Sequence, residues 1–253
     1  MNKICALIPA RYGSTRLEGK SLLKINNESI ISRTYNQTLK SKYLNKDNVY
    51  VVTDDERIMN EIVMINGKVI IVKDECLNGT ERICKALNKM NDNYEIIVNI
   101  QGDEPFIDPE TIDFMIDKHF EYSYLNNNVV CTTVHSIIKD ESHLYKSSFG
   151  KMVIDKFNNI IYCSRALIPS NKDNKIIKDY NYLTHIGIFV FKKWYLDEYI
   201  KHENTPLQLM EDIEWLKIIE MGYQIKSFLS PNEYEIGVNT IDDYNYLVNK
   251  YQK

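Results

Sequence analysis

The first half of the chain alternates between short apolar runs and segments with helical spacing. Four runs have the length of a strand, at Ile4 to Ile8, Val49 to Thr53, Lys68 to Val72 and Glu95 to Ile100. Helical spacing or a capping residue marks the segments between and after them, at Ile30 to Leu44, after Asp54-Asp55, at Gly79 to Met90 and at Pro109 to Phe120. Because strands that alternate with helices pair in parallel and are covered on both faces, this half predicts a doubly wound α/β sheet.

From Val129 onward, strand patterns are denser and helical spacing is rarer. Strand-like runs lie at Val129 to Val134, Gly150 to Ile154, Ile160 to Tyr162 and His185 to Phe191. Asn158-Asn159 is typical of a hairpin turn, and helical spacing returns at Pro206 to Met221 and Asp242 to Tyr251. We therefore predict one domain over residues 1–253 with a mixed, mostly parallel sheet. A β-rich insertion at about 129–200 is expected to pair two protomers in a homodimer.

Composition excludes several classes of protein. The net charge of −4 does not suit a protein that neutralises a nucleic-acid backbone, so no nucleic-acid partner is expected. The longest apolar runs, such as Ile186 to Phe191, are far shorter than the roughly 20 residues that a bilayer requires. Five cysteines without a Cys-x-x-Cys pair, and a first strand with no signal peptide before it, predict free thiols in the cytoplasm.

The loop from Pro9 to Lys20 follows the first predicted strand and precedes a helix. Ligands of α/β sheets bind at such positions. Its glycines allow backbone N–H groups to approach a phosphate, and Arg11, Arg16 and Lys20 add positive charge. The spacing is neither that of a Walker A loop nor that of a dinucleotide fingerprint. The loop is therefore either a phosphate site or an ordinary basic surface turn.

A second motif, Gln101-Gly102-Asp103-Glu104-Pro105, follows the fourth predicted strand. Carboxylate oxygens at that edge of the sheet, opposite a basic loop, suit Mg²⁺ shared with phosphate oxygens. A solvated turn of the same composition is the alternative. Together, a phosphate loop and a carboxylate at neighbouring strand ends make nucleotidyl transfer a plausible activity.

These motifs resemble those of the CMP-Kdo synthetases, the 3-deoxy-manno-octulosonate cytidylyltransferases of the nucleotide-diphosphosugar transferase fold. The resemblance extends over nearly the whole chain. Beyond the two motifs above, it rests on Thr53-Asp54-Asp55, Asn78 to Arg82, Ser164 to Pro169, His185 to Ile188 and Gly237 to Thr240. It implies transfer of CMP from CTP to the anomeric hydroxyl of a 2-keto-3-deoxy sugar acid, with release of pyrophosphate and a requirement for Mg²⁺.

The resemblance also implies a set of site residues. By similarity, catalysis rests on Arg11, Lys20 and Asp103. The implied nucleotide contacts are Arg11, Lys20, Gly79, Thr80, Arg82 and Gln101. The implied sugar-acid contacts are Arg165, His185, Phe189, Glu214 and Trp215, and the implied metal ligands are Asp103 and Asn239. From the residues alone, His185 also fits a core histidine, which is the commoner role of such a residue, and Arg165 also fits a structural ion pair.

The chain departs from the family pattern at the metal and sugar positions. Asn239 stands where the family usually has Asp, and Phe189 and Trp215 stand where it usually has Tyr and Gln. Because polar contacts to the sugar are replaced, we predict either a different sugar-acid acceptor or a site that has partly lost its function. Three hypotheses follow: a Kdo cytidylyltransferase, a cytidylyltransferase for a modified Kdo-like or sialic-type acid, and a non-catalytic nucleotide-binding protein of this fold.

Overall fold

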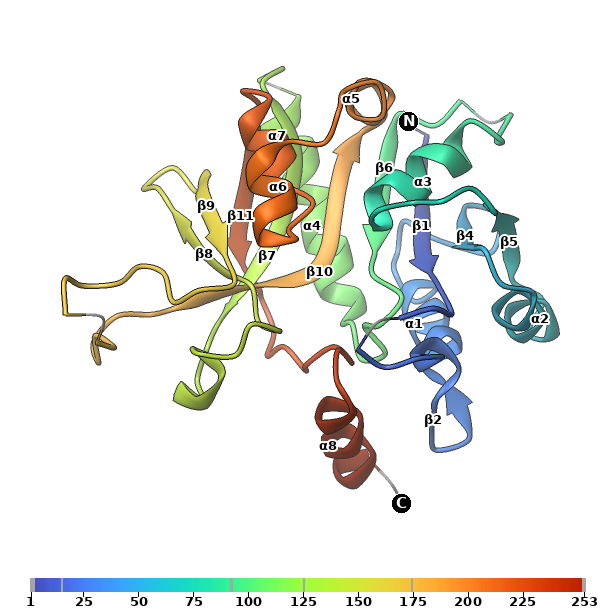
Figure 1. The fold of residues 1–253 in the computed structure, drawn as a ribbon. Helices are drawn as coiled ribbons and strands as arrows, with labels where there is room; N and C mark the ends of the chain where they lie inside the picture. The colour runs from blue at the N-terminus through green and yellow to red at the C-terminus, as the bar shows by residue number, and fades with distance from the viewer. Residues whose placement is uncertain (1–2, 15, 92, 125, 174, 252–253) are drawn as a thin grey trace.

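The computed structural model describes residues 3–14, 16–91, 93–124, 126–173 and 175–251 (Figure 1). Within them, nine strands form one sheet, and seven follow each other in the order β11-β7-β10-β6-β1-β4-β5. These strands are β1 (Ile4–Ala10), β4 (Val49–Thr53), β5 (Lys68–Ile71), β6 (Ile96–Ile100), β7 (Val129–Ile137), β10 (Leu183–Lys192) and β11 (Gln224–Leu229). The first four correspond to the four predicted runs, with ends that differ by two residues at most.

Strand direction makes the sheet mixed. β1 pairs in parallel with β4 and β6, β4 with β5, and β11 with β7. β10 runs antiparallel to both β6 and β7. The predicted mixed, mostly parallel α/β sheet is therefore confirmed.

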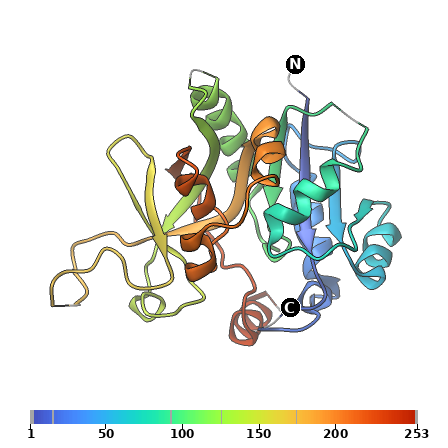
Figure 2. The same ribbon diagram turned by 45° about the horizontal axis from the view of Figure 1, so that its top comes forward.

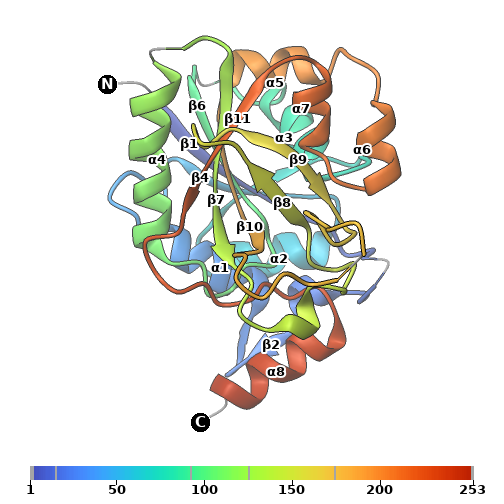
Figure 3. The same cartoon turned by 90° about the vertical axis from the view of Figure 1, so that its left-hand side faces the viewer.

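Helices cover both faces of the sheet, as Figure 3 shows for α4 on one side and α3, α5, α6 and α7 on the other. One apolar core contains side chains of α1 (Ile30–Thr38), α2 (Glu56–Met64) and α4 (Pro109–Ser123). The other contains side chains of α3 (Gly79–Leu87), α5 (Lys193–Tyr199) and α7 (Leu216–Glu220), and α6 (Pro206–Glu211) precedes α7. Ile8 of β1 faces the first core and Leu7 the second. Burial on both faces explains why these strands are continuously apolar.

Local polar residues determine where the helices of the first half begin. The side chains of four N-cap residues accept a backbone N–H of the following turn: Ser29, Asp55, Asn78 and Asp108. Each replaces a hydrogen-bond acceptor that the first turn of a helix lacks. The Asp55 cap confirms the helix expected after Asp54-Asp55.

The C-terminal helix α8 (Ile241–Tyr251) packs against residues 25–30, below the sheet in Figure 1. Its Leu247 shares a small apolar cluster with Ile25, Ile30 and Val238. Ile25 belongs to a two-stranded sheet of β2 (Lys24–Ile25) and β3 (Glu28–Ser29). Val238 lies in the segment before α8, and its carbonyl accepts a hydrogen bond from Lys20 at the end of the first loop.

The region 129–200 is divided between the main sheet and a projecting part. β7 and β10 are members of the main sheet, whereas β8 (Lys151–Ile154) and β9 (Ile160–Ser164) form a hairpin at its side. Figure 2 shows this hairpin and the following segment extending away from β1. Asn158 has a positive φ of 66°, as its turn requires, which confirms the predicted hairpin. Pairing of protomers through this region stays a prediction.

Several predicted boundaries were wrong. The helix expected over 30–44 ends at Thr38. The helical stretch over 206–221 is two helices, because Asp212 adopts a left-handed conformation that ends α6. β11, α5 and the β2–β3 pair were not predicted. No helix in the described ranges combines the length and hydropathy needed to cross a membrane.

Candidate active site

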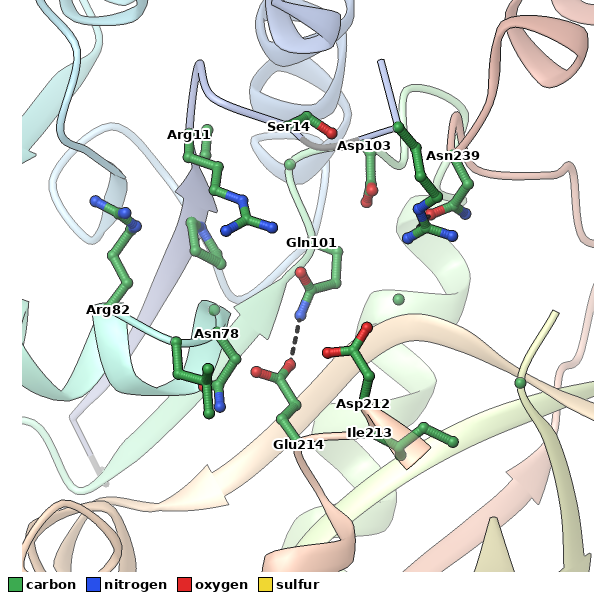
Figure 4. A pocket seen from close by; sticks show the side chains of 18 of the residues that line it. Arg11, Ser14, Asn78, Arg82, Gln101, Asp103, Asp212, Ile213, Glu214 and Asn239 are labelled. Atoms are coloured by element: carbon green, nitrogen blue, oxygen red, sulfur yellow. Dashed lines mark hydrogen bonds between the residues drawn. The ribbon is translucent and has the colours of Figure 1, made fainter. Parts of the chain in front are cut away.

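A pocket of about 310 Å³ lies at the carboxyl ends of β1 and β6 (Figure 4). Most of the site residues expected from the sequence line it, namely Arg11, Lys20, Gly79, Arg82, Gln101, Asp103, Arg165, His185, Glu214, Trp215 and Asn239. Two expected residues, Thr80 and Phe189, are buried and are not among the lining residues. The pocket is thus built from segments far apart in the sequence.

The first loop folds back on itself through Gly19. Its N–H donates to the Tyr12 carbonyl at 2.9 Å, and its φ is +64°. A Cβ at this position would lie 3.0 Å from the Tyr12 ring. Only glycine fits both conditions without strain. The turn leads into a short 3₁₀ helix, Lys20–Leu22, whose first residue projects into the pocket.

Lys20 joins the two segments that carry the expected metal ligands. Its ammonium group donates to the Asp103 carboxylate and, at 3.2 Å, to the Val238 carbonyl. The neighbouring Asn239 presents its amide oxygen to the Arg16 guanidinium at 3.4 Å. In Figure 4 Asp103 and Asn239 lie beside each other at one end of the pocket. This end therefore combines oxygen ligands with positive charge.

The opposite end of the pocket contains the amino terminus of α3. The Asn78 side chain caps this helix by accepting the Glu81 N–H, and the Thr80 N–H donates to the Glu214 carboxylate at 2.8 Å. The Gln101 amide donates to the other Glu214 oxygen at 3.1 Å. Burial raises the pKa of Glu214, and these hydrogen bonds oppose the rise. The two hydrogen bonds fix the orientation of the Glu214 carboxylate. The amino terminus of α3 stabilises its negative charge.

Arg82 is held by the protein itself. Its guanidinium donates to the Asp54 carboxylate at 2.8 Å and to the Val72 carbonyl at 3.0 Å, and its side chain is buried. The contact links α3 to the ends of β4 and β5. The structure thus gives the Asp54 motif a partner that the sequence did not indicate.

Arg165 stands at the pocket wall with most of its donors engaged. Nε donates to the Glu211 carbonyl at 2.8 Å, Nη1 to the Ser147 carbonyl at 2.9 Å, and Nη2 to the Asp212 carbonyl at 2.7 Å. The Asp212 carboxylate also accepts from Nη2 at 3.2 Å. The structural ion pair considered from the sequence is therefore present, and the guanidinium remains a pocket-lining group.

Three aromatic rings pack together beside the pocket: His185 and Trp215 line it, and Phe189 is buried against Trp215. Trp215 stacks on Phe189 with ring centroids 4.5 Å apart and contacts His185 edge-on at 4.4 Å. The Trp215 indole N–H donates to the Cys163 thiol at 3.3 Å, directed away from the pocket. Burial, and secondarily the charge of Arg165, lowers the pKa of His185 to about 4. At neutral pH the imidazole is therefore uncharged.

Sequence reasoning assigned no individual role to several residues at this site, although Glu104 was one of the two carboxylates in the predicted Mg²⁺ motif. Ser14, Glu104 and Asp212 line the pocket, and only 6% of the Glu104 surface is exposed. Burial and the adjacent Asp103 carboxylate raise the pKa of Glu104 to about 8. A Glu next to a predicted ligand was a usable signal for Glu104. Nothing in the local pattern indicated Asp212.

The fold and the pocket are those of an enzyme that transfers a nucleotidyl group, with a basic loop after β1 and a carboxylate after β6. A family model for cytidylyltransferases matches residues 5–229. The chain is also similar to the 3-deoxy-manno-octulosonate cytidylyltransferase of Protochlamydia amoebophila, with 38% identity covering 95% of this chain and 91% of the relative. The mitochondrial enzyme of that name from Arabidopsis thaliana is 39% identical over 96% of this chain and 81% of its own length.

A solved structure agrees with these relatives. The structure of a CMP:2-keto-3-deoxy-manno-octonic acid synthetase complexed with CTP superimposes with a TM-score of 0.85 at 26% identity, covering 98% of each chain. The chain therefore belongs to the family of 3-deoxy-manno-octulosonate cytidylyltransferases and is a nucleotidyltransferase.

Proposed function

We propose that this protein transfers CMP from CTP to 3-deoxy-manno-octulosonate (Kdo) in the cytoplasm, with release of pyrophosphate. The observation that carries the proposal is the single pocket that joins the basic first loop to Asp103, in a chain whose relatives are named for this activity. A related solved structure holds CTP. The acceptor's anomeric hydroxyl oxygen bonds to the α-phosphorus, pyrophosphate leaves, and the hydroxyl proton passes to water.

The basic groups of the pocket suit the triphosphate. Arg11 points into the pocket from the end of β1 in Figure 4, and Lys20 and Arg16 extend from the same loop. Charge on the phosphate oxygens and on the departing pyrophosphate is stabilised by such fixed cations. Positioning and charge neutralisation, rather than a covalent nucleophile, are the main contributions of these residues.

The donor set at the Lys20 end of the pocket fits Mg²⁺. One carboxylate oxygen of Asp103 and the amide oxygen of Asn239 are hard ligands, and Mg²⁺ is usually held by one or two carboxylates together with phosphate oxygens and water. Among the described residues, no group of three His, Cys, Asp or Glu side chains forms a protein-only cation site. When bound, the ion neutralises charge on the phosphates.

Arg165, His185 and Glu214 surround the space left for the sugar acid. Four hydrogen bonds to protein acceptors leave Arg165 one of its five N–H donors, and this donor together with the guanidinium charge is assigned to the acid function of the sugar. Glu214, fixed by α3, faces the pocket where a sugar hydroxyl can donate to it.

A modified sugar acid is the second candidate acceptor. The observation that favours it is the aromatic cluster of His185, Phe189 and Trp215, in which Phe189 is buried and the Trp215 N–H is directed to Cys163. Neither side chain offers a hydrogen bond to a sugar hydroxyl. A site that lacks such groups discriminates less against an acid with fewer or altered hydroxyls.

The test is pyrophosphate release with CTP and Mg²⁺, comparing Kdo with other 2-keto-3-deoxy sugar acids. Turnover with Kdo, lost in Lys20→Met, supports the proposal. Turnover only with another acid supports the second candidate. Binding of CTP without turnover on any acid refutes both and favours the non-catalytic hypothesis. Light scattering of the same sample tests the proposed homodimer.

A further inference from the structure

The two expected metal ligands lie on different segments, and Glu104 connects them. Asp103 belongs to the loop after β6, and Asn239 belongs to residues 230–240, between β11 and α8. The Val238 N–H donates to the Asp103 carbonyl at 2.9 Å, which is a direct contact between the segments. The spacing of the two side chains therefore depends on how firmly these segments are joined.

The buried Glu104 carboxylate is the junction. It accepts the Gly187 N–H at 3.0 Å from β10. It also accepts the Tyr234 hydroxyl, with oxygen distances of 3.0 and 3.1 Å. The Tyr234 oxygen in turn accepts the Gly237 N–H at 3.0 Å. One carboxylate thus links the loop of Asp103 both to the sheet and to the segment of Asn239.

Two glycines make room for this carboxylate. A Cβ on Gly187 would lie 2.5 Å from the Glu104 Oε1 atom, and a Cβ on Gly237 would lie 3.1 Å from the same atom. Neither glycine has the positive φ that would by itself require glycine. Close approach of Glu104 therefore accounts for Gly187, and at Gly237 the Asp103 carbonyl, also at 3.1 Å, restricts the space together with Glu104.

We infer that Glu104 and Tyr234 are positioning residues that set the separation between Asp103 and Asn239 and thereby the affinity for the divalent cation bound with CTP. The inference rests on the proposed function, because that function supplies the cation and the nucleotide. Residues that orient metal ligands typically change metal affinity by about 10- to 100-fold when they are replaced. Glu104 and Tyr234 act through the ligands and do not touch the cation.

The test uses Tyr234→Phe, which removes only the hydroxyl. Mn²⁺ serves as the probe, titrated by electron paramagnetic resonance with CTP present. CTP is titrated separately without metal. We expect the Mn²⁺ dissociation constant to rise about tenfold, while CTP affinity without metal stays within about twofold. Tyr43→Phe is the matched control, since it removes a tyrosine hydroxyl that donates to Asp117 outside the pocket.

A second pair of variants keeps the inference testable if Tyr234→Phe does not fold. Glu104→Gln retains the size of the side chain and an oxygen for the Gly187 N–H, whereas Glu104→Ala retains neither. Mn²⁺ affinity should fall in the order parent, Glu104→Gln, Glu104→Ala. Equal affinities in all three, or no Mn²⁺ binding by the parent with CTP present, overturn the inference.

The parent's transfer activity separates the two claims. If Tyr234→Phe weakens Mn²⁺ binding tenfold but the parent transfers no CMP to Kdo, the inference is supported and the proposed function is refuted. An active parent whose Mn²⁺ affinity is unaffected by Tyr234→Phe overturns the inference alone. Loss of metal-free CTP binding in the variant, in parallel with Mn²⁺, also overturns it, because that pattern indicates general damage.

Discussion

Replacing Gly187 by alanine tests how rigidly the Glu104 carboxylate is held. The Gly187 N–H donates to Glu104 at 3.0 Å, and its carbonyl accepts the Gln101 N–H at 2.8 Å. The added Cβ would lie 2.5 Å from Glu104 Oε1 and 2.7 Å from its Cγ. Real carbon atoms do not approach this closely, so Glu104 or β10 must shift.

Two costs set the size of the effect. Overpacking a well-filled site costs about 1–3 kcal/mol. Displacing Glu104 also breaks a hydrogen bond and leaves a buried polar atom unpaired, which costs about 1–3 kcal/mol. Because partial relaxation reduces both, we expect the free energy of unfolding to fall by about 3 kcal/mol in Gly187→Ala.

The assay is urea-induced unfolding followed by circular dichroism, with Gly13→Ala as the matched control. Gly13 lies in the first loop, and a Cβ there meets nothing within 4 Å. The control should stay within about 0.5 kcal/mol of the parent, as most exposed substitutions do. If Gly187→Ala is also within that range, Glu104 is free to move and the reasoning about its packing is refuted.

Two further predictions concern charge. Asn239→Asp adds a carboxylate beside Asp103, so Mg²⁺ affinity and turnover should rise about tenfold. If a metal titration gives the same Mg²⁺ affinity for Asn239→Asp and the parent, the amide oxygen of Asn239 already suffices as a metal ligand. Burial, and secondarily Lys192, lowers the pKa of His119 to about 3. The unfolded chain therefore binds an additional proton below about pH 6.5, and stability falls as the pH drops towards 3. Replacing His119 by Gln should make the dependence of unfolding free energy on pH shallower by up to about 1.4 kcal/mol per unit between pH 6 and 4. Equal slopes in urea unfolding at pH 6, 5 and 4 would contradict this.

The parallel half of the sheet could be predicted because its signals are local. Continuous apolar runs such as Val49 to Thr53 identify strands buried on both faces, and caps such as Asp55 mark helix starts. β11 was not predicted, because the polar residues of Gln224–Leu229 interrupt the apolar run that identifies a buried strand. Lys226 is nonetheless buried there, since its ammonium group donates to the Phe157 carbonyl and the Asn159 side chain.

The candidate site could be predicted in part. The sequence motifs indicated residues that line one pocket, including Lys20, Asp103 and Glu214. Their partners could not be predicted, because hydrogen bonds between distant segments leave no periodic pattern. Arg82 donates to Asp54, 28 positions away, and Glu214 accepts from Thr80 across 134 positions.

The sequence by itself determined the alternation of elements and, through several separate motifs, the family, because each strand, cap and motif depends on residue types within a short stretch. Only the tertiary structure decided that Glu104 joins Gly187 and Tyr234, the latter 130 positions away. Such a buried carboxylate is stable only when folding supplies its hydrogen-bond partners. The positions of those partners follow from chain packing, which no local pattern specifies.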